Sequence, residues 1–138
     1  MPVSRQVSLA LLLLRIAAAL AFFYHGGGIL FGAFGGPGPQ QFAVSHSWPT
    51  ILGYLVGLAQ FGGALALLTG VFFRFGALCI VIVMLGAIFT VHLPHGFNVG
   101  DGGMEYALTQ ALVAVSLFLT GPGDYSLAAL MPAPLRKF

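Results

Sequence analysis

Charged residues are scarce in this sequence of 138 residues: Asp, Glu, Lys and Arg together make up 6% of it, whereas hydrophobic residues make up 59%. Soluble domains carry about 25% charged residues, so this composition excludes an ordinary water-soluble domain. Together with a mean hydropathy of +1.00 it predicts an all-α integral membrane protein surrounded by lipid. Basic residues are too few, and too little interleaved with aromatic ones, for us to expect a nucleic-acid partner.

Cysteine is almost absent as well. The single residue, Cys79, lies inside an apolar run and excludes an internal disulfide, and we interpret it as a small buried apolar side chain. The sequence also contains no phosphate-binding loop, paired-cysteine motif or nucleophile elbow. Nucleotide hydrolysis, thiol–disulfide exchange and serine hydrolase chemistry are therefore not expected.

Long apolar runs dominate what remains. They cover residues 9–31, 51–69, 72–92 and 104–120, with Gly and Pro in the gaps between them. Each run approaches the roughly 20 residues that a membrane span requires. The sequence thus predicts one transmembrane domain over residues 1–138, an antiparallel bundle of four transmembrane helices. The first run continues to full spanning length, so we expect a retained span rather than a cleaved signal peptide.

The positions of the basic residues predict an orientation. Arg5 precedes the first run, Arg74 follows the short turn between the second and third, and Arg136 and Lys137 follow the fourth. In a chain with four spans all of them fall on one side, and the loops of the other side contain no Lys or Arg. The positive-inside rule then places both termini in the cytoplasm.

Small residues in the second and third runs predict close helix packing. Gly53 and Gly57 form a GxxxG pair, which Gln60 and Ala64 continue along one helix face. Gly76, Gly86 and Ala87 offer a similar strip on the third run. We favour packing of the bundle over a ligand groove for these faces. The sequence leaves open whether the contact is within one chain or between two copies.

Polar residues at membrane depth are the candidates for function. Arg15 lies within the first run, where a central charge costs about 2.5 to 3.5 kcal/mol. It either snorkels or pairs structurally, or it contacts an anionic ligand. His25 ends the first run, His92 ends the third and Glu105 begins the fourth, so all three lie at one level in the outer half. They are the candidate catalytic groups for proton transfer, unless the histidines only mark wet helix ends.

Further candidates lie next to these groups. Tyr106 adjoins Glu105, and Thr109 and Ser116 share a helix face with it, which we expect to point inward for ligand contact or for hydrogen bonds between helices. Gln60 hydrogen-bonds either a ligand carbonyl or, as buried glutamines more often do, a neighbouring helix. The first loop carries aromatic residues that form a lid or an interfacial anchor; these are Phe42, His46 and Trp48.

The same part of the chain contains candidate metal ligands. His92 and His95 are three residues apart and Asp101 follows, which makes them the weak candidates for metal ligands. Pro94 disfavours a helical conformation just before it, so helical ligand spacing cannot be assumed. We therefore expect no metal ion, and no heme held by two of the four histidines.

Five short segments, taken in order, resemble the bacterial DoxX family over nearly the whole chain. They are YHG at 24–26, LFGAFGGPG at 30–38, TVHLPHGF at 90–97, GGMEYAL at 102–108 and GPGDYSL at 121–127. The resemblance implies a four-helix protein of the bacterial inner membrane, with links to quinone-coupled oxidation, quinone resistance and thiol stress. The polar positions that recur in the family match Arg15, His25, His92 and Glu105.

Two positions depart from the family pattern. Ile29 stands where the family often has a Lys, and Gln60 stands where it often has an acid, so an ion pair or relay between those positions is absent here. Redox chemistry would then depend on the histidines and Glu105. The resulting hypothesis is a quinone-interacting subunit or redox-stress protein, with quinone as the cofactor.

Two other function classes remain open. A non-enzymatic scaffold or assembly factor would use the glycine-lined faces to bind another membrane protein or a second copy of the chain. A small transporter is disfavoured because four helices enclose little pathway and no inverted repeat is evident.

Overall fold

The computed structural model describes residues 4–136 and 138, and within them every regular element is a helix. Lys137, one of the predicted cytoplasmic bases, lies outside the described residues. The longer helices are α1 (Arg5–Phe31), α2 (Gly38–Ser45), α3 (Thr50–Thr69), α4 (Phe73–Ala87) and α5 (Glu105–Thr120). A π-helical segment, η2 (Ile88–His92), continues α4, and the short 3-10 turns are η1 (Ala33–Gly35), η3 (Leu93–His95), η4 (Val99–Asp101), η5 (Leu127–Leu130) and η6 (Ala133–Leu135).

The ends of the helices follow from local chemistry. The side chain of Ser4 caps α1 by accepting a hydrogen bond of 3.3 Å from the backbone N–H of Val7. Gly32 ends α1 with φ +67° and Gly70 ends α3 with φ +81°, a left-handed conformation that glycine adopts without steric cost. After Gly70 the chain reverses within a few residues, so α3 and α4 are antiparallel neighbours.

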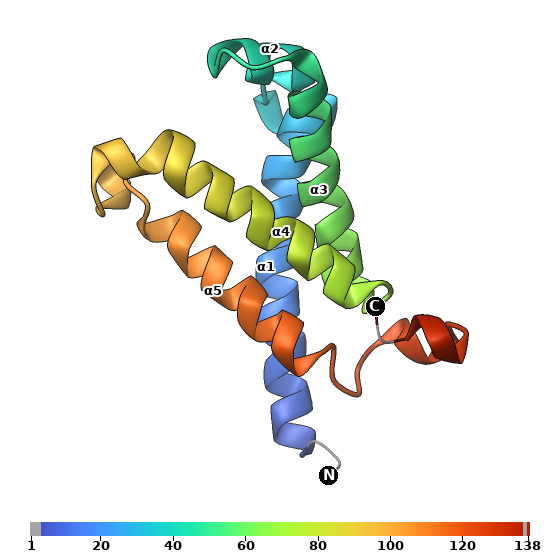
Figure 1. Cartoon of the computed structure of the whole chain (residues 1–138). Helices are drawn as coiled ribbons and strands as arrows, with labels where there is room; N and C mark the ends of the chain where they lie inside the picture. Colours follow the sequence, from blue (N-terminus) through green and yellow to red (C-terminus); the bar gives the residue numbers. More distant parts are fainter. Residues whose placement is uncertain (1–3, 137) are drawn as a thin grey trace.

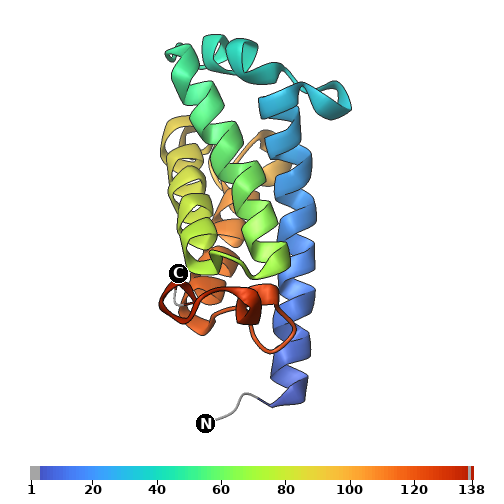
Figure 2. The ribbon, with the colours of Figure 1, turned by 90° about the vertical axis from the view of Figure 1, so that its right-hand side faces the viewer.

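The helices are arranged as two crossed pairs. α1 and α3 lie side by side, while α4 and α5 form a second antiparallel pair that runs obliquely across them (Figure 1). Figure 2 shows α2 bridging the upper ends of α1 and α3, and the segment with η5 and η6 folded across the lower end. The two pairs diverge towards the upper end (Figure 1).

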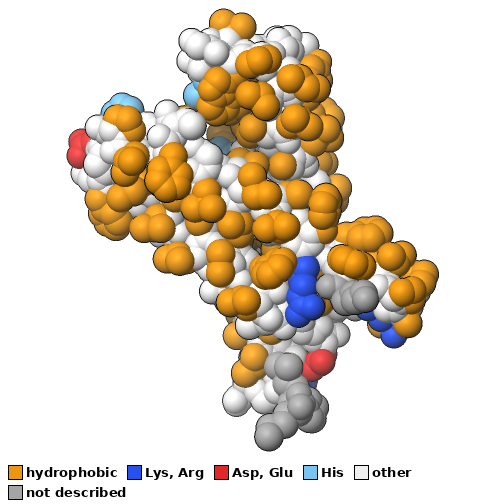
Figure 3. Space-filling view, viewed as in Figure 1, with side chains coloured by type: hydrophobic (Ala, Val, Ile, Leu, Met, Phe, Trp, Pro, Cys, Tyr) orange, Lys and Arg blue, Asp and Glu red, His pale blue; other side chains and the backbone are white. Residues whose placement is uncertain are grey.

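Three helices are long and apolar enough to cross a membrane: α1, α3 and the continuous segment Phe73–His95 that begins with α4. α5 is a shorter apolar helix of 16 residues. The exposed surface is largely hydrophobic along these helices (Figure 3). The expectation of an all-helical protein of membrane type is therefore confirmed.

The core joins the two pairs through one large buried side chain from each main helix. Phe22 of α1, Leu67 of α3, Ile80 of α4 and Leu117 of α5 are at most 1% exposed. At about 25 cal/mol per Å² of apolar surface, such burial stabilises a fold in water, but within lipid the gain comes from close packing instead.

Small residues provide that close packing, and they do so within one chain. A Cβ atom at Gly53 would collide with the carbonyl group of Pro39, and one at Gly57 would lie 3.0 Å from the Cβ of Leu30. Gly76 of α4 approaches Ala66 of α3 in the same way. The predicted strip of α3 therefore packs against α1 and α2, and Gly76 of the predicted strip on α4 packs against α3. Gly86 behaves differently, because no atom lies within 4 Å of a Cβ built there.

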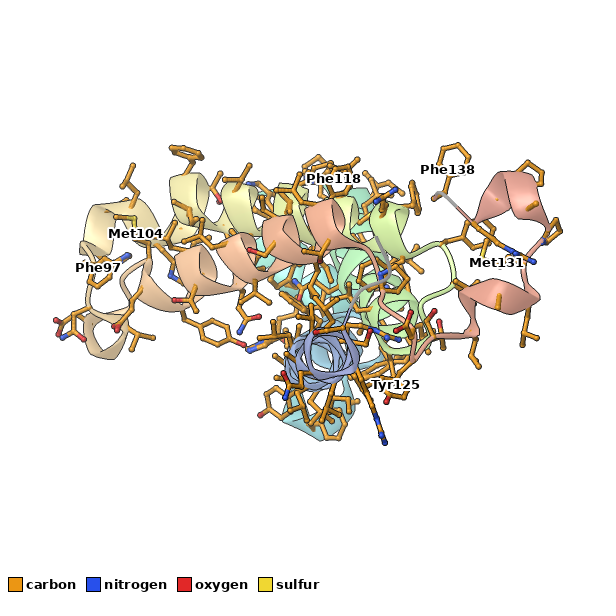
Figure 4. All side chains as sticks on the ribbon, turned by 90° about the horizontal axis from the view of Figure 1, so that it is seen from below. Phe97, Met104, Phe118, Tyr125, Met131 and Phe138 are labelled. Carbon is orange, nitrogen blue, oxygen red and sulfur yellow. The ribbon has the colours of Figure 1, made fainter. Side chains whose placement is uncertain are left out.

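Basic side chains gather at the end of the molecule where α1 begins and α5 ends (Figure 3). The Nε of Arg74 donates to the carbonyl oxygen of Phe118, at 3.1 Å, and the Nε of Arg5 lies 3.4 Å from the hydroxyl of Tyr125. Seen from below, Phe97 and Met104 lie at the far tip of the α4–α5 pair (Figure 4).

Candidate functional site

A cavity of about 820 Å³ occupies the space where α3 and α4 diverge, and it also contacts α1, α5 and the loop around α2. The space-filling view shows this hollow between the α2–α3 end and the tip of the α4–α5 pair (Figure 3). Its volume falls within the range of about 300–1,000 Å³ that is typical of small-molecule sites. Apolar side chains form most of the wall. The polar lining residues are His25, His46, Gln60, Thr90, His92 and Tyr106.

Gln60 is the buried polar group of this cavity. It belongs to the small-residue face of α3, and its side chain is 5% exposed. Within residues 4–136 and 138 its amide makes no hydrogen bond, so the bond to a neighbouring helix that glutamines commonly form is not observed. The amide is accessible at the cavity, where a ligand that carries hydrogen-bonding oxygens would pair with it. The buried side-chain atom that lacks a partner among the described residues is instead the Oε1 of Gln110, which lies outside the cavity.

His92 enters the cavity from the π-helical segment η2. Its Nδ1 lies 2.7 Å from the carbonyl oxygen of Gly102, which can only accept a hydrogen bond, so Nδ1 carries the proton in the neutral ring. The Nε2 atom is then an unprotonated acceptor. Single π-helical turns inside α-helices are frequent at functional sites, and here the turn coincides with the candidate proton acceptor.

His46 is a lining residue that the sequence placed only in a lid or an anchor. Its Nδ1 lies 2.8 Å from the carbonyl oxygen of Phe42, which again leaves Nε2 as the acceptor of the neutral ring. The His46 ring stacks on Trp48 at 4.8 Å and lies 4.5 Å from the Phe42 ring. All three residues line the cavity. A signal for this arrangement is present in the sequence. Phe42 and His46 follow Pro39 and are four residues apart, a spacing that places two side chains on one face of a helix.

His25 and Tyr106 come together at the same cavity. Their rings lie 6.0 Å apart, although they belong to the last turns of α1 and the first turn of α5. The phenol of Tyr106 is a donor and acceptor, and its side chain is 39% exposed. Thus the structure assembles His25, Gln60, His92 and Tyr106, from four helical segments, around one space.

Glu105 does not line the cavity. Its Oε2 accepts a hydrogen bond of 3.1 Å from the backbone N–H of Val99, in the loop that also supplies the Gly102 carbonyl to His92. The carboxylate therefore holds the loop that orients His92. Arg15 is outside the cavity as well, buried against backbone carbonyls where α3 ends.

The predicted inward stripe on α5 is wrong. Thr109 and Ser116 are exposed, and each hydroxyl donates to the carbonyl four residues before it, at 2.8 Å. This back-bonding satisfies a hydroxyl without any partner from another helix. The face of α5 that packs inward consists of small and apolar residues instead; these are Ala107, Ala111, Ala114 and Leu117.

The candidate metal ligands His95 and Asp101 form hydrogen bonds with residues close to them in the sequence. His95 Nδ1 lies 2.9 Å from the carbonyl oxygen of Val91, and an Asp101 carboxylate oxygen accepts from the Asn98 amide at 2.8 Å. Among the described residues, no group of three His, Cys, Asp or Glu side chains is placed to hold a metal ion.

Comparison with known proteins gives a consistent assignment. Residues 10–93, more than half of the chain, match the model of the DoxX family. A relative named "Putative oxidoreductase CatD", from Bacillus subtilis (strain 168), is 29% identical over 118 residues, which cover 86% of this chain and 84% of the relative. No solved structure matches. The matched region includes most of α1 and all of α3 and α4, and hence three walls of the cavity.

Proposed function

This chain belongs to the DoxX family, and we propose that it binds a quinone in the cavity between α3 and α4 as the quinone-interacting subunit of a redox or redox-stress system. The single observation that carries this proposal is the amide of Gln60. Gln60 as a residue is 5% exposed and lines a largely apolar cavity, and its amide makes no hydrogen bond within the described part of the chain. A flat apolar ring with oxygens at its edge suits such a site.

The residues of the cavity have distinct roles in this proposal. Gln60 donates a hydrogen bond to a ring oxygen, and the Nε2 atom of His92 accepts the proton of a ring hydroxyl. His25 and Tyr106 flank the end of the cavity where His92 lies. Glu105 positions His92 through the loop of residues 96–104. A bound quinone would supply two-electron chemistry coupled to two protons, with a partner redox protein as the source or acceptor of the electrons.

We further propose that α1, α3, the α4–η2 segment and α5 form four spans of the bacterial inner membrane, with both termini in the cytoplasm. Arg5 bonds to Tyr125, Arg74 to Phe118 and Arg136 to Met131, so all three lie at the end of α5 or at the segment that follows it, which supports this orientation through the positive-inside rule. The cavity then lies in the half of the membrane that faces away from the cytoplasm.

The test is quinone binding to the protein purified in mild detergent, preceded by an absorbance spectrum and solvent extraction of whatever copurifies. Gln60→Leu and His92→Ala should each weaken binding about tenfold or more, the loss expected for a hydrogen bond worth about 1.4 kcal/mol. Gln110→Leu is the matched control for Gln60→Leu, because Gln110 is a half-buried glutamine of α5 that does not line the cavity. Equal binding by wild type and both cavity variants would refute the proposal.

A scaffold is the alternative, and it draws less support from the structure than from the sequence. The glycine-lined faces on which it depends are occupied by the chain's own helices, as at Gly53 and Gly57. A quantitative pull-down separates the two functions. A scaffold would recover one stoichiometric partner and tolerate Gln60→Leu, whereas a quinone site would not tolerate that change.

A further inference from the structure

The cavity has an apolar rim at membrane depth. Leu55 of α3 and Ile82 of α4 line it, yet they are 52% and 60% exposed. The cavity is open rather than enclosed, so exposed side chains on its wall border its opening. Because both helices are long and apolar enough to cross a membrane, the surroundings at this position are hydrocarbon rather than water.

The end of the cavity near the start of α3 is built differently. There the aromatic rings of Phe42, His46 and Trp48 pack on one another, with centroids 4.5 Å to 6.1 Å apart, and contribute to the wall. These rings lie where the chain passes from α2 into α3, beside the helix ends. Aromatic rings thus wall the cavity where α3 begins, and exposed aliphatic residues border it along α3 and α4. His25, Thr90 and Tyr106 line it at other helix ends and are exposed as well, so the access route has to be tested with reagents of different polarity.

We propose that the ligand enters and leaves through a lateral slot between α3 and α4, bordered by Leu55 and Ile82, directly from the hydrocarbon of the bilayer. The ligand class is a quinone with an apolar tail, whose ring lies towards Gln60 and His92 and whose tail leaves through the slot. The identification of the ligand as a quinone rests on the proposed function, whereas the entry route rests only on the exposed residues at the rim of the cavity.

Cys79 provides a reporter inside the cavity. It is the only cysteine of the chain and it lines the cavity. It precedes Ile82 by one helical turn, roughly 4.5 Å along the axis of α4. A thiol reagent that reaches Cys79 has therefore reached the interior, and the wild-type protein needs no engineered label.

The experiment measures the rate of Cys79 modification in proteoliposomes with two reagents, a long-chain N-alkylmaleimide and a negatively charged maleimide that does not enter lipid. The slot is narrowed by Leu55→Trp together with Ile82→Trp. The matched control is Leu58→Trp together with Leu85→Trp, since Leu58 and Leu85 are 55% and 43% exposed on the same two helices but do not line the cavity.

The lateral route predicts that the alkyl reagent modifies wild-type Cys79 much faster than the charged one. The slot variant should slow the alkyl reaction severalfold, and the control variant should not. Equal rates for both reagents, or no effect of the slot variant, would overturn the route. So would protection of wild-type Cys79 from both reagents, because a second copy of the chain or a tightly held lipid would then fill the slot.

A final arm separates the route from the function. A fully substituted benzoquinone with a decyl chain, and the same ring with a methyl group in its place, are added before the alkyl reagent; full substitution prevents addition of the thiol to the ring. The decyl compound should protect Cys79 better. If the slot variant slows labelling and neither quinone protects, the quinone function falls while the slot stands. If both quinones protect equally and the charged reagent reacts freely, the slot falls while the function stands.

Discussion

The Nε of Arg15 lies 2.7 Å from the carbonyl oxygen of Leu67, in the last turn of α3. Its two terminal nitrogens donate to the carbonyl oxygens of Leu68, Pro122 and Tyr125, at distances of 2.6–2.8 Å. The side chain is 1% exposed. The guanidinium therefore lies against the negative end of the α3 helix dipole and ties it to the loop after α5. Of the two roles open from the sequence, this geometry supports structural pairing.

Arg15→Met should lower the free energy of unfolding by about 3 kcal/mol or more, because buried carbonyls then lose a charged donor. Arg15→Lys should cost less, since an ammonium keeps the charge but cannot fan out to all of these oxygens. Thermal unfolding in detergent, followed by Trp48 fluorescence, measures both. Arg5→Met is the control, because the single bond of Arg5 is long and exposed. Equal destabilisation by Arg15→Met and Arg5→Met would contradict the assignment.

Two adjacent glycines of α1 should respond in opposite directions to alanine. A Cβ at Gly26 would lie 2.6 Å from the backbone nitrogen of Phe61, whereas the nearest atom to one at Gly27 is 3.5 Å away, on the Phe34 ring. Gly26→Ala should therefore destabilise the protein by about 1–3 kcal/mol through overpacking. Gly27→Ala should be neutral or stabilise it by up to about 1 kcal/mol through helix propensity.

The same unfolding measurement checks this pair in a single series. Because the two positions are neighbours in one helix, differences in depth or detergent contact are small. If Gly26→Ala were no more destabilising than Gly27→Ala, α1 would not approach α3 at Gly26 as closely as described.

Hydropathy was sufficient to locate the long apolar helices, because lipid requires long apolar runs and leaves a helix little choice of length. It did not locate α2, which lies in the segment predicted as the first loop. Each of the four predicted runs falls on a helix of the structure, with Gly32, Gly70 and Gly121 at the ends of three of them. Gln60 could also be placed in the interior, since it continues the small-residue face of Gly53 and Gly57. Such a periodic pattern is a property of one helix and can be read from sequence.

The composition of the site depends on contacts between segments, which the sequence does not encode locally. The prediction of the inward face of α5 is wrong because Thr and Ser hydroxyls can bond to a carbonyl of their own helix, and such residues can face outward as well as inward. The sequence suggests a catalytic role for Glu105 because of its expected depth in the membrane. Depth alone does not show whether a side chain faces the cavity or the adjoining loop. The approach of His46 depends on how α2 folds over the helices, and the π-helical turn at His92 has no sequence signature.

His92→Asn should separate folding from ligand binding. The asparagine amide can replace the Nδ1–H that donates to Gly102, but it cannot reach the position of Nε2. We expect near wild-type stability with quinone binding reduced about tenfold, the equivalent of one hydrogen bond of about 1.4 kcal/mol. His92→Gln should show the reverse pattern, with a polar atom near the Nε2 position and the Gly102 bond lost. Unfolding and binding curves on the two variants test this, and identical behaviour would exclude the assigned roles of the two ring nitrogens.

Gly86 allows the cavity to be filled without disturbing the packing. It lines the cavity, and no atom lies within 4 Å of a Cβ at this position, so a side chain there would extend into the open space. Gly86→Phe should abolish quinone binding and slow the reaction of Cys79 with an alkyl maleimide, while the unfolding temperature stays near that of the wild type.

Gly62 is the matched control for that substitution. It is an exposed glycine of α3, also with no atom within 4 Å of a Cβ, but it does not line the cavity. Gly62→Phe should leave both binding and Cys79 reactivity unchanged. Because both variants add the same ring to an open helical position, a difference between them can arise only from the cavity. Retained binding in Gly86→Phe would place the quinone outside this space, and the roles given to Gln60 and His92 would fall with it.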